Sequence, residues 1–356
     1  MIGIAMQDAA AAARVSAVAL SRVKGVPKDA VDSVLLVRES GVQGDAHAGP
    51  GPRQVSLLAW PSIRRMEQRF GSPLGFGRFG ENVVVDAPLD RVGVGDLIGL
   101  GRDAVLEVTA IGKECHRGCA IRLKTGDCIM PREGVFARVV ASGPVTAGDP
   151  ARFLRRSTDL AVVVLAGGRS RRFGSDKRFA RLADGRTCLE RAVQTAREVS
   201  TNVIVSVAHD ESGLSVPGAR VVSDETPDAG PLGGLVTSLG VCEAPIVLAF
   251  AVDQVGVTAD LLRVLAVRTT GPGACLEDAK TVHPLPCALD RARVFARLAG
   301  ALQAGRLALH EVLDDAGVSR LPVESIAELG AACSLLANWN TPADADGTFR
   351  AIPPAR

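Results

Sequence analysis

Hydrophobic residues follow two different patterns along the chain, and each pattern predicts a different kind of domain. In the first part, short apolar runs are separated by glycine, proline and charged residues, which is typical of a mainly β domain. The strands predicted there are Val15–Leu20, Ser33–Val37, Val55–Leu58, Asn82–Val85 and Val105–Ala110. Helical periodicity is confined mainly to Ser62–Phe70. We therefore expect a mostly β, barrel-like domain over residues 14–152, after a loose tail, residues 1–13.

Beyond this region, apolar strands alternate with amphipathic helices. The strands are predicted at Ala161–Leu165, Val203–Val207, Val221–Asp224 and Pro245–Ala251, and the helices at Ala259–Val267 and from Leu189 to near Ser200. This alternation predicts a three-layer, Rossmann-like α/β domain with a mainly parallel sheet over residues 159–356. The short basic stretch 153–158 is the expected linker between the two domains.

Length and composition narrow the class of protein. At 356 residues the chain exceeds the usual size of one domain, and its hydrophobic fraction of 47% is enough for two cores. Aromatic residues make up 3% and the formal net charge is +2, so the sequence offers neither base-stacking platforms nor a basic surface for nucleic acid. Eight cysteines are too sparse in so long a chain for a disulfide scaffold. Without a signal peptide or transmembrane run, we expect a cytoplasmic protein with free thiols and no membrane partner.

The most informative stretch begins where the first strand of the second domain ends. Gly167 and Gly168 follow that strand almost at once, and a cluster of cations comes next: Arg169, Arg171, Arg172, Lys177 and Arg178. Bare backbone and cations together suit a polyphosphate, although a βα turn with a solvated basic loop is the simpler alternative. The stretch has neither the Gly-x-Gly-x-x-Gly fingerprint nor the Gly-Lys-Ser/Thr ending of a Walker loop.

Polar residues also end three further predicted strands. Ser206, Asp224 and Asp253 each come at or just after the end of an apolar run. Ligands of parallel sheets lie beyond the carboxyl ends of the strands, so we expect these residues on one rim with the glycine turn. Asp253 either caps the next turn or binds Mg²⁺ beside a triphosphate, because Mg²⁺ favours carboxylate and phosphate oxygens.

Residues 165–177, Leu-Ala-Gly-Gly-Arg-Ser-Arg-Arg-Phe-Gly-Ser-Asp-Lys, closely resemble the opening signature of the MobA-type molybdenum cofactor guanylyltransferases. Phe173 replaces the usual methionine. Three further segments match in order and spacing: 230–234, His283-Pro284 and 338–344. The resemblance covers roughly residues 158–350. It departs from the family at Val252-Asp-Gln-Val255, where Cys-Asp-x-Pro is usual.

This resemblance implies transfer of GMP from GTP to molybdopterin with Mg²⁺. It implies nucleotide or cofactor contacts at Leu165, Ala166, Gly167, Gly168, Lys177, Ser206, Asp224, Gly230, Asn338 and Asn340. Lys177 and Arg172 would hold the phosphates, and Asp253 would bind Mg²⁺. Cytidylyl transfer to the same cofactor, and a cofactor-binding or storage module without turnover, remain as alternatives.

Cysteine chemistry is concentrated in the first domain, where Cys115, Cys119 and Cys128 lie close in sequence. Lysine, histidine and arginine beside Cys115 favour its thiolate. From the residues alone three interpretations stay open: a zinc site formed with His116, buried structural cysteines, and a reactive or molybdenum-ligating thiolate.

The first domain also carries polar corners set between glycines, Gly41–Gly49 with Asp45 and His47, and Gly80-Glu-Asn82. Together with residues 53–58, 112–116, 126–137 and 148–149, these resemble a MOSC domain, the module at the C-terminus of molybdenum cofactor sulfurases. The resemblance implies a β-rich fold that handles sulfur or the cofactor through Cys115, with Cys128 as the fallback. It leaves open sulfur transfer, molybdenum ligation and pyridoxal phosphate binding. The implied partners are GTP, molybdopterin, and other cofactor-biosynthesis proteins or molybdoenzymes.

Overall fold

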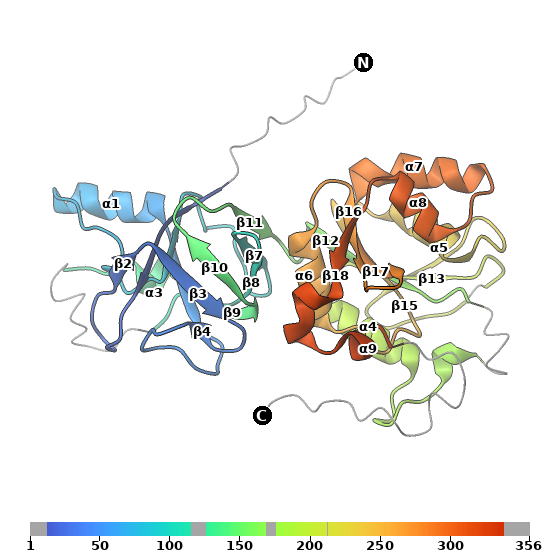
Figure 1. Ribbon diagram of the computed structural model, residues 1–356, viewed down its shortest axis with the longest axis horizontal. Coiled ribbons are helices and arrows are strands. Elements are labelled where there is room, and N and C mark those ends of the chain that lie inside the picture. Colours follow the sequence, from blue (N-terminus) through green and yellow to red (C-terminus); the bar gives the residue numbers. More distant parts are fainter. Residues whose placement is uncertain (1–12, 115–125, 169–175, 212, 338–356) are drawn as a thin grey trace, which may run out of the picture. The chain divides into compact units, whose positions relative to one another are not determined.

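The chain divides into two compact units, Met1–Arg155 and Arg156–Arg356, in the computed structural model (Figure 1). The structure describes residues 13–114, 126–168, 176–211 and 213–337. Nearly all of the expected N-terminal tail therefore lies outside the described residues. Only residues 155–159 separate the last strand of the first unit from the first strand of the second.

The first unit is built mainly from strands. They are β1 (Val15–Leu20), β2 (Asp29–Val31), β3 (Ser33–Val37), β4 (Gly41–Val42), β5 (Val55–Ala59), β6 (Val83–Val85), β7 (Leu97–Leu100), β8 (Ala104–Ile111), β9 (Val135–Ala141), β10 (Gly143–Thr146) and β11 (Ala151–Leu154), with helices α1 (Trp60–Phe70) and α3 (Met130–Glu133). One sheet has the order β11-β7-β8-β9-β5-β6-β1-β2 and the other β10-β3-β4. The mainly β character is confirmed, but among the described strands the pairing leaves β11 and β2 as edges and closes no barrel.

Two apolar clusters hold the first unit together. Leu36 of the smaller sheet packs with Leu57 and Leu106 of the larger sheet in one cluster. Leu58 packs with Ile63 of α1 in the other. Because successive residues of a strand point to opposite faces, β5 contributes to both clusters, and this is why its five residues are all buried.

The second unit surrounds a mixed sheet. Its elements are β12 (Leu160–Leu165), the 3-10 helix η1 (Lys177–Phe179), α4 (Cys188–Val199), β13 (Val203–Val207), β14 (Arg220–Ser223), α5 (Gly230–Val241), β15 (Ile246–Ala251), α6 (Ala259–Arg268), β16 (Gly273–Glu277), β17 (Val282–Asp290), α7 (Arg291–Gln303), α8 (Leu309–Asp315), β18 (Ser319–Pro322), η2 (Val323–Leu329) and α9 (Ala332–Leu335). The sheet order is β14-β13-β12-β15-β17-β16-β18. Pairs from β14 to β15 are parallel, whereas β17 is antiparallel to both β15 and β16.

Helices in this unit begin where the sequence supplies caps, and their apolar faces cover the sheet. Thr258 caps α6 as expected, and Thr187 forms a capping box with Glu190 at the start of α4. Every residue of β12 is buried. Its alternate residues share a core with α5, α7 and α8, so the others face the opposite side of the sheet. Within the described residues, no helix is long and apolar enough to span a bilayer.

Candidate functional site

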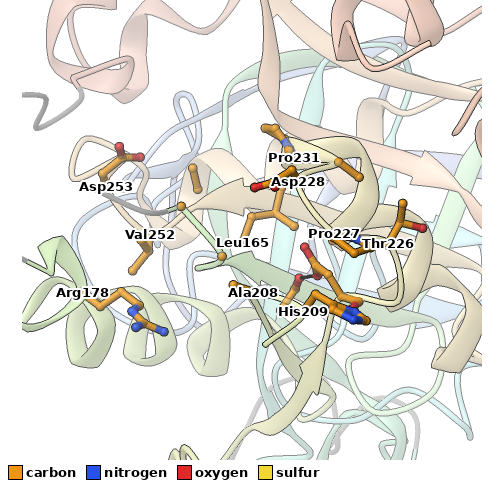
Figure 2. A pocket seen from close by; sticks show the side chains of 18 of the residues that line it. Leu165, Arg178, Ala208, His209, Thr226, Pro227, Asp228, Pro231, Val252 and Asp253 are labelled. Carbon is orange, nitrogen blue, oxygen red and sulfur yellow. Dashed lines mark hydrogen bonds between the residues drawn. The ribbon is translucent and has the colours of Figure 1, made fainter. Parts of the chain in front are cut away.

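A cavity of about 540 Å³ lies beyond the carboxyl ends of the central strands of the second unit (Figure 2). Eight residues predicted from the sequence line it: Leu165, Gly167, Gly168, Lys177, Ser206, Asp224, Gly230 and Asp253. Ala166 lies beneath the lining, buried, with its N–H donating to the carbonyl of Ser206 at 2.7 Å. The parallel pairing of β12 with β13 and β15 is what brings these residues, distant in sequence, to one rim.

Four predicted residues cannot be placed in this way. Arg172, Asn338 and Asn340 lie outside the described residues, and so does Cys115 of the first unit. The His283-Pro284 motif falls in β17, where the ring of His283 is 2.9 Å from a carboxylate oxygen of Asp278. Among described residues, Leu285 of the same strand lines the cavity.

One end of the cavity combines a cation with a carboxylate. Lys177, at the start of η1, places its Nζ 3.3 Å from Oδ2 of Asp253. Figure 2 shows Asp253 and Arg178 at this end, away from His209 and Thr226. Arg178 is held by Asp176 and Glu211, with Nη1 2.7 Å from Oε1 of Glu211. Arg178 therefore lines the cavity with its charge balanced by two carboxylates, and Lys177 lines it paired with Asp253.

The Asp253 carboxylate at this end is compatible with a magnesium ion that also binds the phosphates of a ligand. Among the described residues there is no group of three or more histidine, cysteine or acidic side chains that could hold a metal. Mg²⁺ needs no such cage, because it usually binds one or two carboxylates together with phosphate oxygens and water. Asp253 can supply the carboxylate, and a phosphate-bearing ligand beside Lys177 can supply the rest.

A hydrogen-bonded pair forms another part of the wall. The hydroxyl of Ser206 donates to Oδ1 of Asp224 at 2.5 Å. Burial raises the pKa of the Asp224 carboxyl, although the bond from Ser206 opposes this. Gly234 of α5 packs directly on the pair, because a Cβ there would lie 2.4 Å from the Ser206 hydroxyl. Only glycine fits this position without moving Ser206 or Asp224.

Sequence reasoning missed Gln254, which follows Asp253 and is buried. Its amide bonds to Ala251 and Leu285, both of which line the cavity. The only signal in the sequence was a second polar residue, next to Asp253, between two valines.

The first unit contains a buried polar cluster at the two corners singled out in its sequence. The Asp45 side chain is only 2% exposed and accepts hydrogen bonds from Lys28, from the His47 N–H (2.8 Å) and from the Asn82 amide (3.1 Å). Burial opposes its ionisation, but the bonds from Lys28 and from the His47 N–H hold the pKa of Asp45 below its usual value. Burial also lowers the pKa of Lys28, against the bond to Asp45. Asp45 is therefore an internal anchor, while the His47 side chain is half exposed.

Glu81 and Cys128 lie in the same unit and are also buried. Burial raises the pKa of Glu81 to about 7, against backbone N–H donors from Gly77 and Phe79. Cys128 packs in the cluster beneath α1, which is the environment of a structural cysteine.

Family models match both units. Residues 43–152 match the MOSC domain, and residues 162–319 match the MobA-like NTP transferase domain. A "probable molybdenum cofactor guanylyltransferase" of Opitutus terrae is 34% identical over 194 residues, which are 52% of this chain and 93% of that protein. A protein of the same description from Chloroflexus aggregans is 40% identical over 106 residues, and here the match spans only half of the relative and 29% of this chain.

Among solved structures, molybdopterin-guanine dinucleotide biosynthesis protein A from Archaeoglobus fulgidus is similar at 20% identity. The similarity covers 52% of this chain and 94% of that protein, with a TM-score of 0.45.

Proposed function

The chain belongs to the molybdenum cofactor guanylyltransferase family, and on that premise we propose that its second unit transfers GMP from GTP to molybdopterin. The terminal phosphate oxygen of the cofactor attacks the α-phosphorus of GTP, and the bond to the β-phosphate oxygen breaks. The products are molybdopterin guanine dinucleotide and pyrophosphate. The observation that carries the proposal is that the glycine turn, Lys177 and Asp253 meet in one cavity.

The residues of the cavity act by position and charge. The attacking phosphate is already an anion at neutral pH, so no strong general base is needed. Lys177 would bind the phosphates of GTP as a point charge, joined by Arg172 from outside the described residues. Asp253 would hold Mg²⁺, which when bound would neutralise charge on the leaving pyrophosphate. Asn338 and Asn340 remain our proposed contacts on the pterin side.

Asp224 is the residue that we propose recognises the base of the nucleotide. Its Oδ1 is fixed by Ser206, and its Oδ2 lies beside Gly167, since a Cβ on that glycine would be 3.4 Å away. Guanine presents two adjacent donors, N1–H and the 2-amino group, whereas the pairing edge of cytosine presents one donor beside acceptors. A carboxylate acceptor therefore favours GTP over CTP.

Replacing Gly234 by alanine should raise the KM for GTP about 10-fold or more, because the new methyl group must displace the Ser206–Asp224 pair. Gly240→Ala is the matched control on the same helix, since its Cβ would lie 3.7 Å from the Phe295 ring, an ordinary contact. Steady-state kinetics with GTP would compare the two. Equal KM values would show that the pair does not contact the nucleotide.

The first unit, as a MOSC domain, is proposed to bind or sulfurate the same cofactor through Cys115. Support comes from the family match over residues 43–152. Because both units would recognise one pterin, linking them raises the concentration of the product of one site at the other. Separately expressed halves that perform as well as the intact chain would contradict this coupling.

Pyrophosphate release tests the proposed function. The intact chain would be incubated with Mg²⁺, molybdenum-loaded molybdopterin and either GTP or CTP. Release with GTP alone is the expected result. Release with CTP alone would make the protein a cytidylyltransferase, and cofactor binding without release from either nucleotide would favour a storage module.

A further inference from the structure

Gln254 makes two hydrogen bonds inside the turn that carries Asp253. Only 7% of the residue is exposed. Its Oε1 accepts from the Ala251 N–H at 2.8 Å, and its Nε2 donates to the Leu285 carbonyl at 2.8 Å. Reversing the amide would set donor against donor and acceptor against acceptor, so the two contacts define its orientation. Both polar ends of the side chain are therefore engaged.

These two bonds lie just beyond the last paired residues of β15 and β17. The antiparallel pairing of β15 with β17 runs from Ile246 opposite Asp290 to Ala249 opposite Cys287. Two residues further along, the same register would place Ala251 opposite Leu285. The side chain of Gln254 instead bridges the backbones of these two residues. It therefore connects β15 and β17 two residues beyond their last direct pair. The bridge lies at the cavity, since Ala251 and Leu285 both line it.

We propose that Gln254 is a positioning residue for Asp253. Its side chain holds the turn so that the Asp253 carboxylate faces Lys177 and a nucleotide-bound metal ion. Backbone bonds close the turn on either side, from the Gln254 N–H to the Ala251 carbonyl (3.0 Å) and from the Val255 N–H to the Asp253 carbonyl (2.9 Å). Proline at 255, usual in the resembling family, could not donate the second bond. Here the glutamine bridge supplies the stiffness that a proline would otherwise give. The inference rests on the proposed function, because it assigns Asp253 to the metal.

The test compares Gln254→Met with Gln54→Met in the intact chain. Methionine keeps the length of glutamine and removes both hydrogen bonds. Gln54 is a matched control, because it is a buried amide of the first unit that accepts from the Val139 N–H at 2.7 Å. Two quantities would be measured, the Mg²⁺ concentration that gives half-maximal pyrophosphate release, and the affinity for Mn²⁺ in the presence of GTP by electron paramagnetic resonance.

We expect Gln254→Met to raise the half-saturating Mg²⁺ concentration and weaken Mn²⁺ binding about 10-fold. The KM for molybdopterin should stay unchanged, and saturating Mg²⁺ should restore most of kcat. A general loss of structure would lower kcat at every Mg²⁺ concentration instead. If Gln254→Met does not fold, Gln254→Asn decides the question, since its shorter amide can reach only one of the two partners and should cause a smaller shift in the same direction.

Failure of this inference and failure of the proposed function give different results. If the wild type releases pyrophosphate and the folded Gln254 variants keep its Mg²⁺ and Mn²⁺ dependence, the positioning role is overturned while the function stands. If the wild type releases none but Gln254→Met weakens Mn²⁺ binding, the function is wrong and the positioning role stands. A wild type that binds no Mn²⁺ with GTP would overturn both.

Discussion

Asp253→Asn should lower the rate of pyrophosphate formation about 10³-fold, which corresponds to roughly 4 kcal/mol of transition-state stabilisation. The change keeps the size of the side chain and removes the charge that lies 3.3 Å from Lys177. It therefore removes the proposed metal ligand and leaves Lys177 facing a neutral amide. Because the proposed metal would neutralise charge that grows during the reaction, the loss should appear in kcat.

Asp184→Asn is the matched control. Asp184 is an acidic residue of the same unit, and it pairs with Arg186 on the surface. Both variants would be assayed with GTP and molybdopterin at saturating Mg²⁺, after circular dichroism has shown that each is folded. A fall of less than about 10-fold in Asp253→Asn would place the metal elsewhere, because deleting a single electrostatic contact in an active site typically costs 10² or more.

Lys28→Met should destabilise the first unit by about 3 kcal/mol, because it leaves the carboxylate of Asp45 buried without its cation. Both side chains are almost wholly buried, so solvent cannot take over the pairing. Urea unfolding would be followed by tryptophan fluorescence. The chain has two tryptophans, so a Trp339→Phe background leaves Trp60 as the reporter of the first unit.

The exposed Lys24 offers the control Lys24→Met, which should change the stability by less than about 0.5 kcal/mol. Adding Asp45→Asn to Lys28→Met should recover part of the loss, since the uncompensated charge is then gone. If Lys28→Met proved as stable as the wild type, the pair would contribute nothing to folding.

The strands of both units could be predicted because their apolar runs are short and clearly bounded. Ser33–Val37 and Val203–Val207 were predicted with the bounds that the structure has. The gathering of Ser206, Asp224 and Asp253 at one cavity could be predicted as well, because strand ends in a parallel sheet share an edge.

What could not be predicted depends on contacts between distant residues. The sheet is mainly parallel as expected, but the antiparallel direction of β17 could not be predicted, because no pattern in its sequence sets it. Asp45 resembles an ordinary turn residue in the sequence, and only the approach of Lys28 and Asn82 makes it an internal anchor. The role of Gln254 could not be predicted either, because its hydrogen-bond partner Leu285 is 31 residues away in the sequence.

The buried Glu81 makes the stability of the first unit depend on pH. Glu81 is 0% exposed, and burial raises the pKa of its carboxyl from 4.5 to about 7 in the folded protein. The folded state therefore binds more protons than the unfolded chain between these values, so the stabilising contribution is full below pH 4.5 and is lost as the pH rises through 7. Unfolding near pH 6 should release a proton to the buffer. The calorimetric heat of unfolding should then vary with the ionisation enthalpy of the buffer, and Glu81→Gln should abolish that variation.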